Sequence, residues 1–272
     1  MGNDDRAATG RGPFLAHQIR PGDRYELSQG HAIWCAPTGG DGARRVLRGG
    51  AALASDPAVT EAGIDPGYST EAGHLRAPDV AIGNVPDAPG WIGGTPPLAV
   101  EYAGRGQDEA DLQAKIRELL DAGTRWVWVV RLIGPRRVEV YEAGAEMRIA
   151  GPGELLSAPG ILRNDVPVEA LWDADAADRH TLTNLLQRHG YDGLDAVRAE
   201  GHQEGRQEGH QEGHQEGGLV HARATLRRLL SRRGFAISPA QEARIDACSS
   251  TDTLDLWIDR VLDAASADDV LA

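Results

Sequence analysis

Short apolar segments with an alternating or β-branched pattern recur through the first two thirds of the chain. This pattern predicts β-strands, because alternate side chains of a strand face the same side of a sheet. A first strand or hairpin edge is expected at 25–34, with Gly30 as the turn signal. Further strands are expected at 78–83, 98–102, 125–131 and 137–141.

Two stretches that alternate with these strands have the features of helices. Residues 43–54 follow a glycine-rich loop, and residues 108–122 begin with acidic side chains and are followed by Gly123, as is common at helix ends. The apolar stripe of the second helix consists of Leu112, Ile116, Leu119 and Leu120. The resulting order predicts a mixed α/β fold, in which helices flank a central mixed sheet.

The C-terminal third is predicted to be helical on both sides of a low-complexity segment. Residues 173–199 form a helical connector, and residues 219–272 form a small all-α module in which Ser238 and Gln241 make a capping box. Between them, residues 200–218 repeat the pattern Glu-Gly-His-Gln. Each glycine weakens a helix by roughly 1 kcal/mol relative to alanine. We therefore expect a flexible or marginally helical tether.

Two groups of side chains in this tail have alternative interpretations. His210 and His214 have a spacing that binds metal on a helix, but without a third ligand a solvated spacer is favoured. The first helix of the module has a basic face that suits phosphate contact. The alternative, which we favour, is that these arginines form ion pairs or are solvated. This face consists of Arg223, Arg227, Arg228, Arg232 and Arg233.

Charge limits the classes of function that the chain can perform. Its 272 residues include 28 Lys and Arg against 41 Asp and Glu, a net charge of −13. No broad basic surface is implied, so the chain is not a generic binder of polyanions. Any contact with nucleic acid must use a local basic patch or bound metal ions. Lys115 is the only lysine. Its presence is explained either by chance in an Arg-biased sequence or by selection.

The termini and cysteines give expectations about location. No apolar run has the roughly 18 residues of a membrane span, and the first residues lack the build of a signal peptide. A cytoplasmic protein without membrane association is expected, with residues 1–20 disordered. Cys35 and Cys248 are far apart and form no Cys-x-x-Cys pattern, so neither a disulfide framework nor a cysteine metal site is predicted.

Asp79 and Glu101 are the candidate chemical groups, because each lies in a short apolar strand segment. A buried carboxylate is costly unless it is paired, and two on neighbouring strands repel each other. Mg²⁺ would remove that repulsion, since it accepts carboxylates completed by carbonyl and water oxygens. Lys115 would point its ammonium at them if helix 108–122 packs on the sheet; the alternative is a surface ion pair with Asp111. A metal and an ammonium together suit phosphodiester hydrolysis.

These residues occur in an order that resembles the PD-(D/E)XK nuclease superfamily, and more narrowly the bacterial Uma-two family of predicted endonucleases. The resemblance covers roughly residues 23–172. It is carried by Arg24-Tyr-Glu-Leu, Arg76-Ala-Pro-Asp-Val-Ala, Leu98-Ala-Val-Glu-Tyr and Gly123-Thr-Arg-Trp-Val-Trp-Val-Val. It implies a restriction-endonuclease-like domain at 21–172 that cleaves nucleic acid, expected to be DNA, as a metal-dependent endonuclease.

The resemblance also implies residue roles. Asp79 and Glu101 would be catalytic and would hold Mg²⁺, with Mn²⁺ as an alternative, helped by the backbone carbonyl of Tyr102. Lys115 would orient water or stabilise the transition state. Glu26 is a candidate further acidic member of the site.

The sequence departs from the superfamily pattern at Ala103, where the Glu-x-Lys motif has lysine. In the Uma-type branch the lysine lies on the following helix, which Lys115 fits. The departure keeps open a second interpretation, a catalytically silent nuclease-fold scaffold. The repeat followed by Arg-Arg-Leu-Leu-Ser-Arg-Arg-Gly-Phe resembles the tail of transposase-associated nucleases, which implies a homo-oligomer or a protein partner bound through the C-terminal helices.

Overall fold

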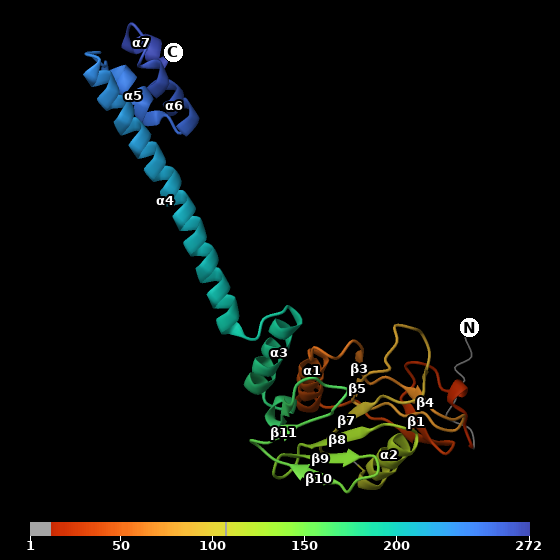
Figure 1. The fold of residues 1–272 in the computed structure, drawn as a ribbon. Coiled ribbons are helices and arrows are strands. Elements are labelled where there is room, and N and C mark those ends of the chain that lie inside the picture. Colours follow the sequence, from red (N-terminus) through yellow and green to blue (C-terminus); the bar gives the residue numbers. More distant parts are fainter. Residues whose placement is uncertain (1–11, 107) are drawn as a thin grey trace, which may run out of the picture. The chain divides into compact units, whose positions relative to one another are not determined.

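The fold is that of a computed structural model, which describes residues 12–106 and 108–272 (Figure 1). Its contacts divide the chain into two compact units, Met1–Leu194 and Asp195–Ala272. In the part of the chain that is described, no helix combines the length and apolar character that crossing a bilayer requires.

A six-stranded sheet organises the first unit, with strand order β10-β9-β8-β7-β5-β3. Strands β7 and β8 run parallel and every other neighbouring pair is antiparallel. Parallel neighbours need a crossover, and α2 (Glu109–Asp121) provides it. The mixed sheet predicted from the sequence is thus confirmed. The strands are β3 (Ala62–Ile64), β5 (Val80–Ile82), β7 (Leu98–Ala103), β8 (Trp126–Arg131), β9 (Arg137–Glu142) and β10 (Arg148–Ala150).

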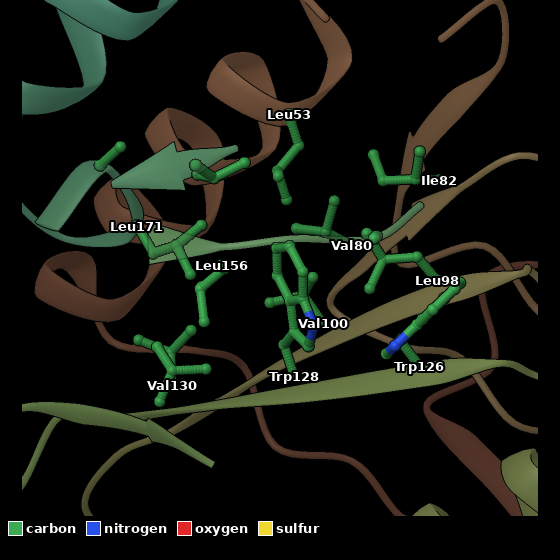
Figure 2. Packing of buried hydrophobic residues seen from close by; sticks show 14 of the residues in the cluster. Leu53, Val80, Ile82, Leu98, Val100, Trp126, Trp128, Val130, Leu156 and Leu171 are labelled. Carbon is green, nitrogen blue, oxygen red and sulfur yellow. The ribbon is translucent and has the colours of Figure 1, made fainter. Parts of the chain in front are cut away.

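The two faces of the sheet have different coverings. One face packs against α1 (Gly40–Ala54) and the segments around Leu156 and Leu171, and Figure 2 shows Trp128 among these side chains. The other face packs against the apolar stripe of α2. Alternation along β7 sends Val100 to the first face and Glu101 to the second. Gly123 follows α2 with φ +114°, as expected at a helix C-terminus.

Smaller elements surround this sheet. The hairpin of β1 and β2 is tied to the segment before β5, because Leu27 and Leu75 exchange backbone hydrogen bonds of 2.8 and 3.0 Å. This contact brings β1 next to the start of β5. The smaller elements are η2 (Ala16–Gln18), β1 (Tyr25–Ser28), β2 (His31–Trp34), β4 (Tyr68–Ser69), β6 (Ile92–Gly93), β11 (Leu155–Leu156), β12 (Val166–Pro167), η3 (Val168–Leu171) and α3 (Ala174–Arg188).

The N-terminal segment differs from the disorder predicted for residues 1–20. Residues 1–11 lie outside the described residues, whereas residues 12–20 are folded onto the first unit. Ala16 and Ile19 are buried in a cluster with Leu27 and Leu75, and the indole of Trp91 donates to the carbonyls of both Ala16 and Ile19. The few apolar residues within this polar segment are enough to anchor it.

One helix, α4 (Leu194–Arg232), begins at the last residue of the first unit and contains the whole repeat. The predicted tether is therefore a continuous helix with exposed side chains rather than a separate element. Ala222, Leu226 and Leu230 are buried and anchor the end of the helix, and each residue added to a formed helix gains one hydrogen bond. Glu, Gln and Arg between the glycines are good helix formers, so they partly offset the cost of glycine.

The end of α4 packs on three short helices, α5 (Pro239–Ala247), α6 (Thr251–Arg260) and α7 (Ala267–Leu271). The capping box predicted at Ser238 and Gln241 forms at the start of α5. This small core consists of Ala222, Leu226, Leu230, Ile245, Leu254, Trp257, Val261, Val270 and Leu271.

Three arginines of the predicted basic face hold these helices together. Arg223 donates to the carbonyl of Cys248, Arg227 pairs with two acids of α5, and Arg233 donates to the carbonyls of Leu262 and Ala264. The contacts favour the ion-pair interpretation of this face over phosphate binding.

Separate cores predict separate unfolding. Leu53→Ala and Leu226→Ala each remove a fully buried side chain from one unit only, so each should lower that unit's free energy of unfolding by about 2–5 kcal/mol. Scanning calorimetry should show two transitions, with a different one shifted in each variant. Leu262→Ala, at a 67 % exposed position, is the control. A single transition shifted equally by both substitutions would contradict the division.

Candidate active site

Strand register places Asp79 and Glu101 opposite each other. Strand β5 pairs antiparallel with β7, with Val80 opposite Val100, so the next pair along the two strands is Asp79 and Glu101. Both residues alternate with side chains of the α1 face and therefore point to the α2 face. The Asp79 carboxylate is fixed by a 2.6 Å hydrogen bond from the backbone N–H of Tyr102. The sheet thus holds two carboxylates at adjacent positions.

Lys115 meets these carboxylates from the helix. It lies on the buried stripe of α2, between Leu112 and Leu119. Its Nζ lies 2.8 Å from Glu101 Oε1 and 3.0 Å from Glu26 Oε1, and it donates to the carbonyl of Ala77 at 2.6 Å. The side chain is only 11 % exposed. Lys115 therefore forms a buried ion pair with Glu101 of the sheet. The alternative prediction, a surface ion pair with Asp111, is wrong.

Glu26 and Arg76 extend the cluster to the hairpin. Glu26, from β1, bridges the Lys115 ammonium and the Arg76 guanidinium, which lies 3.1 Å from its second carboxylate oxygen. Arg76 also pairs with Glu118 of α2, which accepts a hydrogen bond from Ser28 of β1. The hairpin, the segment before β5 and the helix are joined by one buried network.

Burial and mutual attraction shift the ionisation of these groups. Burial raises the pKa of Glu101 to about 8, although Lys115 opposes the shift. Burial also raises the pKa of Asp79 above its ordinary value. Burial alone would lower the pKa of Lys115, but the attraction of Glu101 and Glu26 outweighs it and raises that pKa, so the ammonium stays charged.

Sequence analysis did not identify Arg76, Glu118 or Asp65 as parts of this site. Asp65 directly follows β3, has φ +54°, and donates its backbone N–H to the carbonyl of Asp79 at 3.2 Å. Burial raises its pKa, and the charge of Asp79 adds to that shift. An acidic residue at the end of a short apolar strand was the available signal, the same that identified Asp79. Burial raises the pKa of the nearby Cys35 to about 11, which fits an unreactive thiol.

The residues present fit a hard divalent cation. Glu101 Oε1 is buried and accepts no hydrogen bond of good geometry, and its contact is the ion pair with Lys115. Among residues 12–106 and 108–272, no group of three or more His, Cys, Asp or Glu side chains is arranged to hold a metal. Mg²⁺ does not need one, since it keeps several waters and uses one or two carboxylates. His210 and His214, whose rings contact each other on α4, have no third metal ligand among the residues that the structure describes.

A cleft of about 1090 Å³ opens onto this cluster. Its lining includes Asp79, Glu101, Lys115, Glu26 and Asp65. The carboxylates and the ammonium are therefore accessible to a substrate from one side, although they are largely buried.

Comparisons with known proteins agree with this architecture. The family model Uma2, described as "Putative restriction endonuclease", matches residues 13–169. Among curated proteins there is no significant match. A solved structure titled as a putative nuclease belonging to DUF820, from Anabaena variabilis ATCC 29413, superimposes with a TM-score of 0.52 at 16 % identity. That match covers 61 % of this chain and 99 % of the other, and it establishes the likeness of fold.

The raised pKa of Glu101 predicts a pH-dependent stability in metal-free buffer. The folded chain keeps a proton that the unfolded chain releases near pH 4.5, so stability is lost as pH rises toward about 8. Urea unfolding across this range should show a decline in the free energy of unfolding. Glu101→Gln should flatten the decline.

Glu109→Gln is the matched control on α2. Hydrogen bonding from Arg131 lowers the pKa of Glu109 to about 2, and its unfolded pKa is 4.5, so Glu109 is ionised in both states over nearly all of the range tested. The slope should be unaffected by this substitution. An undiminished slope in Glu101→Gln would contradict the assignment.

Proposed function

The chain belongs to the Uma2 family of restriction-endonuclease-like proteins, and we propose that it is a Mg²⁺-dependent endodeoxyribonuclease that hydrolyses phosphodiester bonds. The family match and the fold support a nuclease. The family match specifies neither the ion nor the type of nucleic acid. Those two parts of the proposal are based on the residues of the site.

The ammonium of Lys115, buried 2.8 Å from Glu101 in the lining of a cleft, is the observation that supports this function most directly. Four acidic side chains line the same cleft, from Glu26, Asp65, Asp79 and Glu101. One ammonium offsets only part of their charge, even with Arg76 paired to Glu26. Burial therefore raises the pKa values of Asp79 and Glu101, and a divalent cation between them would favour their ionised forms.

Each residue of the site would have a separate role in hydrolysis. Asp79 and Glu101 would hold Mg²⁺, with the backbone carbonyl of Tyr102 as a further oxygen ligand. The bound ion would supply an acidified water and charge neutralisation at the phosphate. Lys115 would offer its ammonium to the attacking water or to a phosphate oxygen, where a fixed positive charge stabilises the transition state. Glu26 would position Lys115 through its contact of 3.0 Å with the ammonium.

The alanine at position 103 is consistent with this assignment. Ala103 is buried on the α2 face of β7, in the same cluster as Leu112 and Ile116. A small side chain there leaves room for the helix to pack closely. Lys115 then supplies from the helix the ammonium that the Glu-x-Lys motif would supply from the strand. This geometry favours the enzyme over the silent scaffold.

Cleavage of circular DNA tests the proposal. With Mg²⁺ or Mn²⁺, the full chain should cut single-stranded circular DNA or plasmid, and Asp79→Asn and Lys115→Met should each slow cleavage by roughly a hundredfold or more. Gel electrophoresis measures the rate, and circular dichroism checks that the variants fold.

Asp121→Asn is the matched control, because Asp121 is exposed at the end of α2 and is not part of the cleft lining. It should cleave like the wild type. Absence of metal-dependent cleavage by the wild type, or equal activity in all variants, would rule out the enzyme and favour the scaffold.

A further inference from the structure

Four exposed apolar side chains gather at the cleft that holds the carboxylates. They come from β2, α1, the end of β3 and the turn after β8, so they are distant in sequence. Exposed apolar groups collected around a polar site mark a binding surface rather than scattered surface residues. They are Trp34 at 59 % exposure, Leu47 at 65 %, Ile64 at 50 % and Ile133 at 53 %.

One hairpin connects this apolar rim to the ion cluster. Strand β1 carries Glu26, which contacts Lys115, and the neighbouring Tyr25 pairs across the hairpin with Trp34 on β2. The exposed indole is therefore held by the same two strands that position the ammonium. Of the six tryptophans, Trp34 is the one with the large exposed surface; Trp126, Trp128, Trp172 and Trp257 are buried.

The charge of the cleft does not suit an intact duplex. Acidic side chains outnumber basic ones along its lining, eight to five. Arg24 and Arg105 are exposed at the rim, whereas Arg45 is paired with Asp41. Duplex DNA carries one negative charge per roughly 1.7 Å of its axis, twice the density of one strand, and is bound largely through neutralisation of its phosphates by basic groups. Such attraction is weak here, so affinity must come from a bound cation and from apolar contacts.

The burial of the charged side chains of the site also favours a single strand over a duplex. The side chains of Glu101 and Lys115 are only 9 % and 11 % exposed. In a duplex the bases are stacked on each other and their faces are not available to side chains. A single strand can splay its bases and stack them on aromatic groups while its backbone follows a groove.

We propose that the cleft takes single-stranded nucleic acid, with one base stacked on Trp34 and the adjoining phosphate over Asp79, Glu101 and Lys115. The inference deepens the proposed nuclease function and rests on it for the position of the phosphate. The arginines at the rim would then contact individual phosphates rather than form a continuous basic track. A second copy of this chain covering Trp34 is the competing occupant, and the experiment distinguishes the two.

Binding is measured without hydrolysis, by fluorescence anisotropy of the full chain with Ca²⁺ in place of Mg²⁺. The probes are an oligothymidylate of about 12 nucleotides, within the size range of single-strand sites, and a duplex of equal length. The single strand should bind at least about tenfold more tightly than the duplex and should quench tryptophan fluorescence. Trp34→Ala should weaken its binding by roughly tenfold, the size of one lost stacking contact, and Trp34→Phe should retain most of it.

Leu155→Ala is the control, because Leu155 is 56 % exposed and is not part of the cleft lining. It should bind both probes like the wild type. Equal or tighter binding of the duplex, or unchanged binding by Trp34→Ala, would overturn the proposal. So would a sedimentation experiment in which Trp34→Ala converts a dimer to a monomer without a change in affinity.

The two proposals fail in different ways. Strand binding through Trp34 by a protein that cleaves no DNA would refute the nuclease activity and support the single-strand site. Metal-dependent cleavage that prefers duplex DNA and is unaffected by Trp34→Ala would refute the single-strand site and leave the nuclease proposal intact.

Discussion

The Lys115 ammonium is fixed in a buried position by Glu101, Glu26 and the carbonyl of Ala77. A buried charge is tolerated only where its partners satisfy it, and these partners come from β7, β1 and the segment before β5. Removing Glu101 or Glu26 would leave the buried ammonium with one carboxylate partner fewer. Lys115 therefore determines how α2, the hairpin and the sheet fit together, as well as which groups face the cleft.

Two periodicities of the backbone produce this arrangement. The two-residue repeat of β7 sends Glu101 to the α2 face while Val100 enters the opposite core, and the register with β5 brings Asp79 beside it. The helical repeat of α2 places Lys115 on the same stripe as its core leucines. The carboxyl groups thus meet before any ion is bound, and a divalent cation there would favour their ionised forms.

The sequence alone predicted the parts of the site that lie within single elements. Asp79 and Glu101 stood out because carboxylates are costly inside apolar strands, and the stripe of α2 was visible from its spacing. The placement of Lys115 depended on family resemblance, since spacing equally allowed a pair with Asp111. Arg76 and Glu118 could not be predicted, because their pairing requires the contact between the hairpin and the helix. The glycine repeat predicted a flexible or marginally helical tether. The structure instead has one continuous helix, whose C-terminal end packs in a small core.

The binding of a divalent cation by Asp79 and Glu101 beside Lys115 can be observed in crystals grown with Mn²⁺ and measured for its anomalous scattering. We expect one strong peak about 2.0–2.2 Å from a carboxylate oxygen of each residue, at the distances typical of hard divalent cations. An absence of any peak in the cleft, or a peak bound only by residues outside it, would show that Asp79 and Glu101 do not hold the ion.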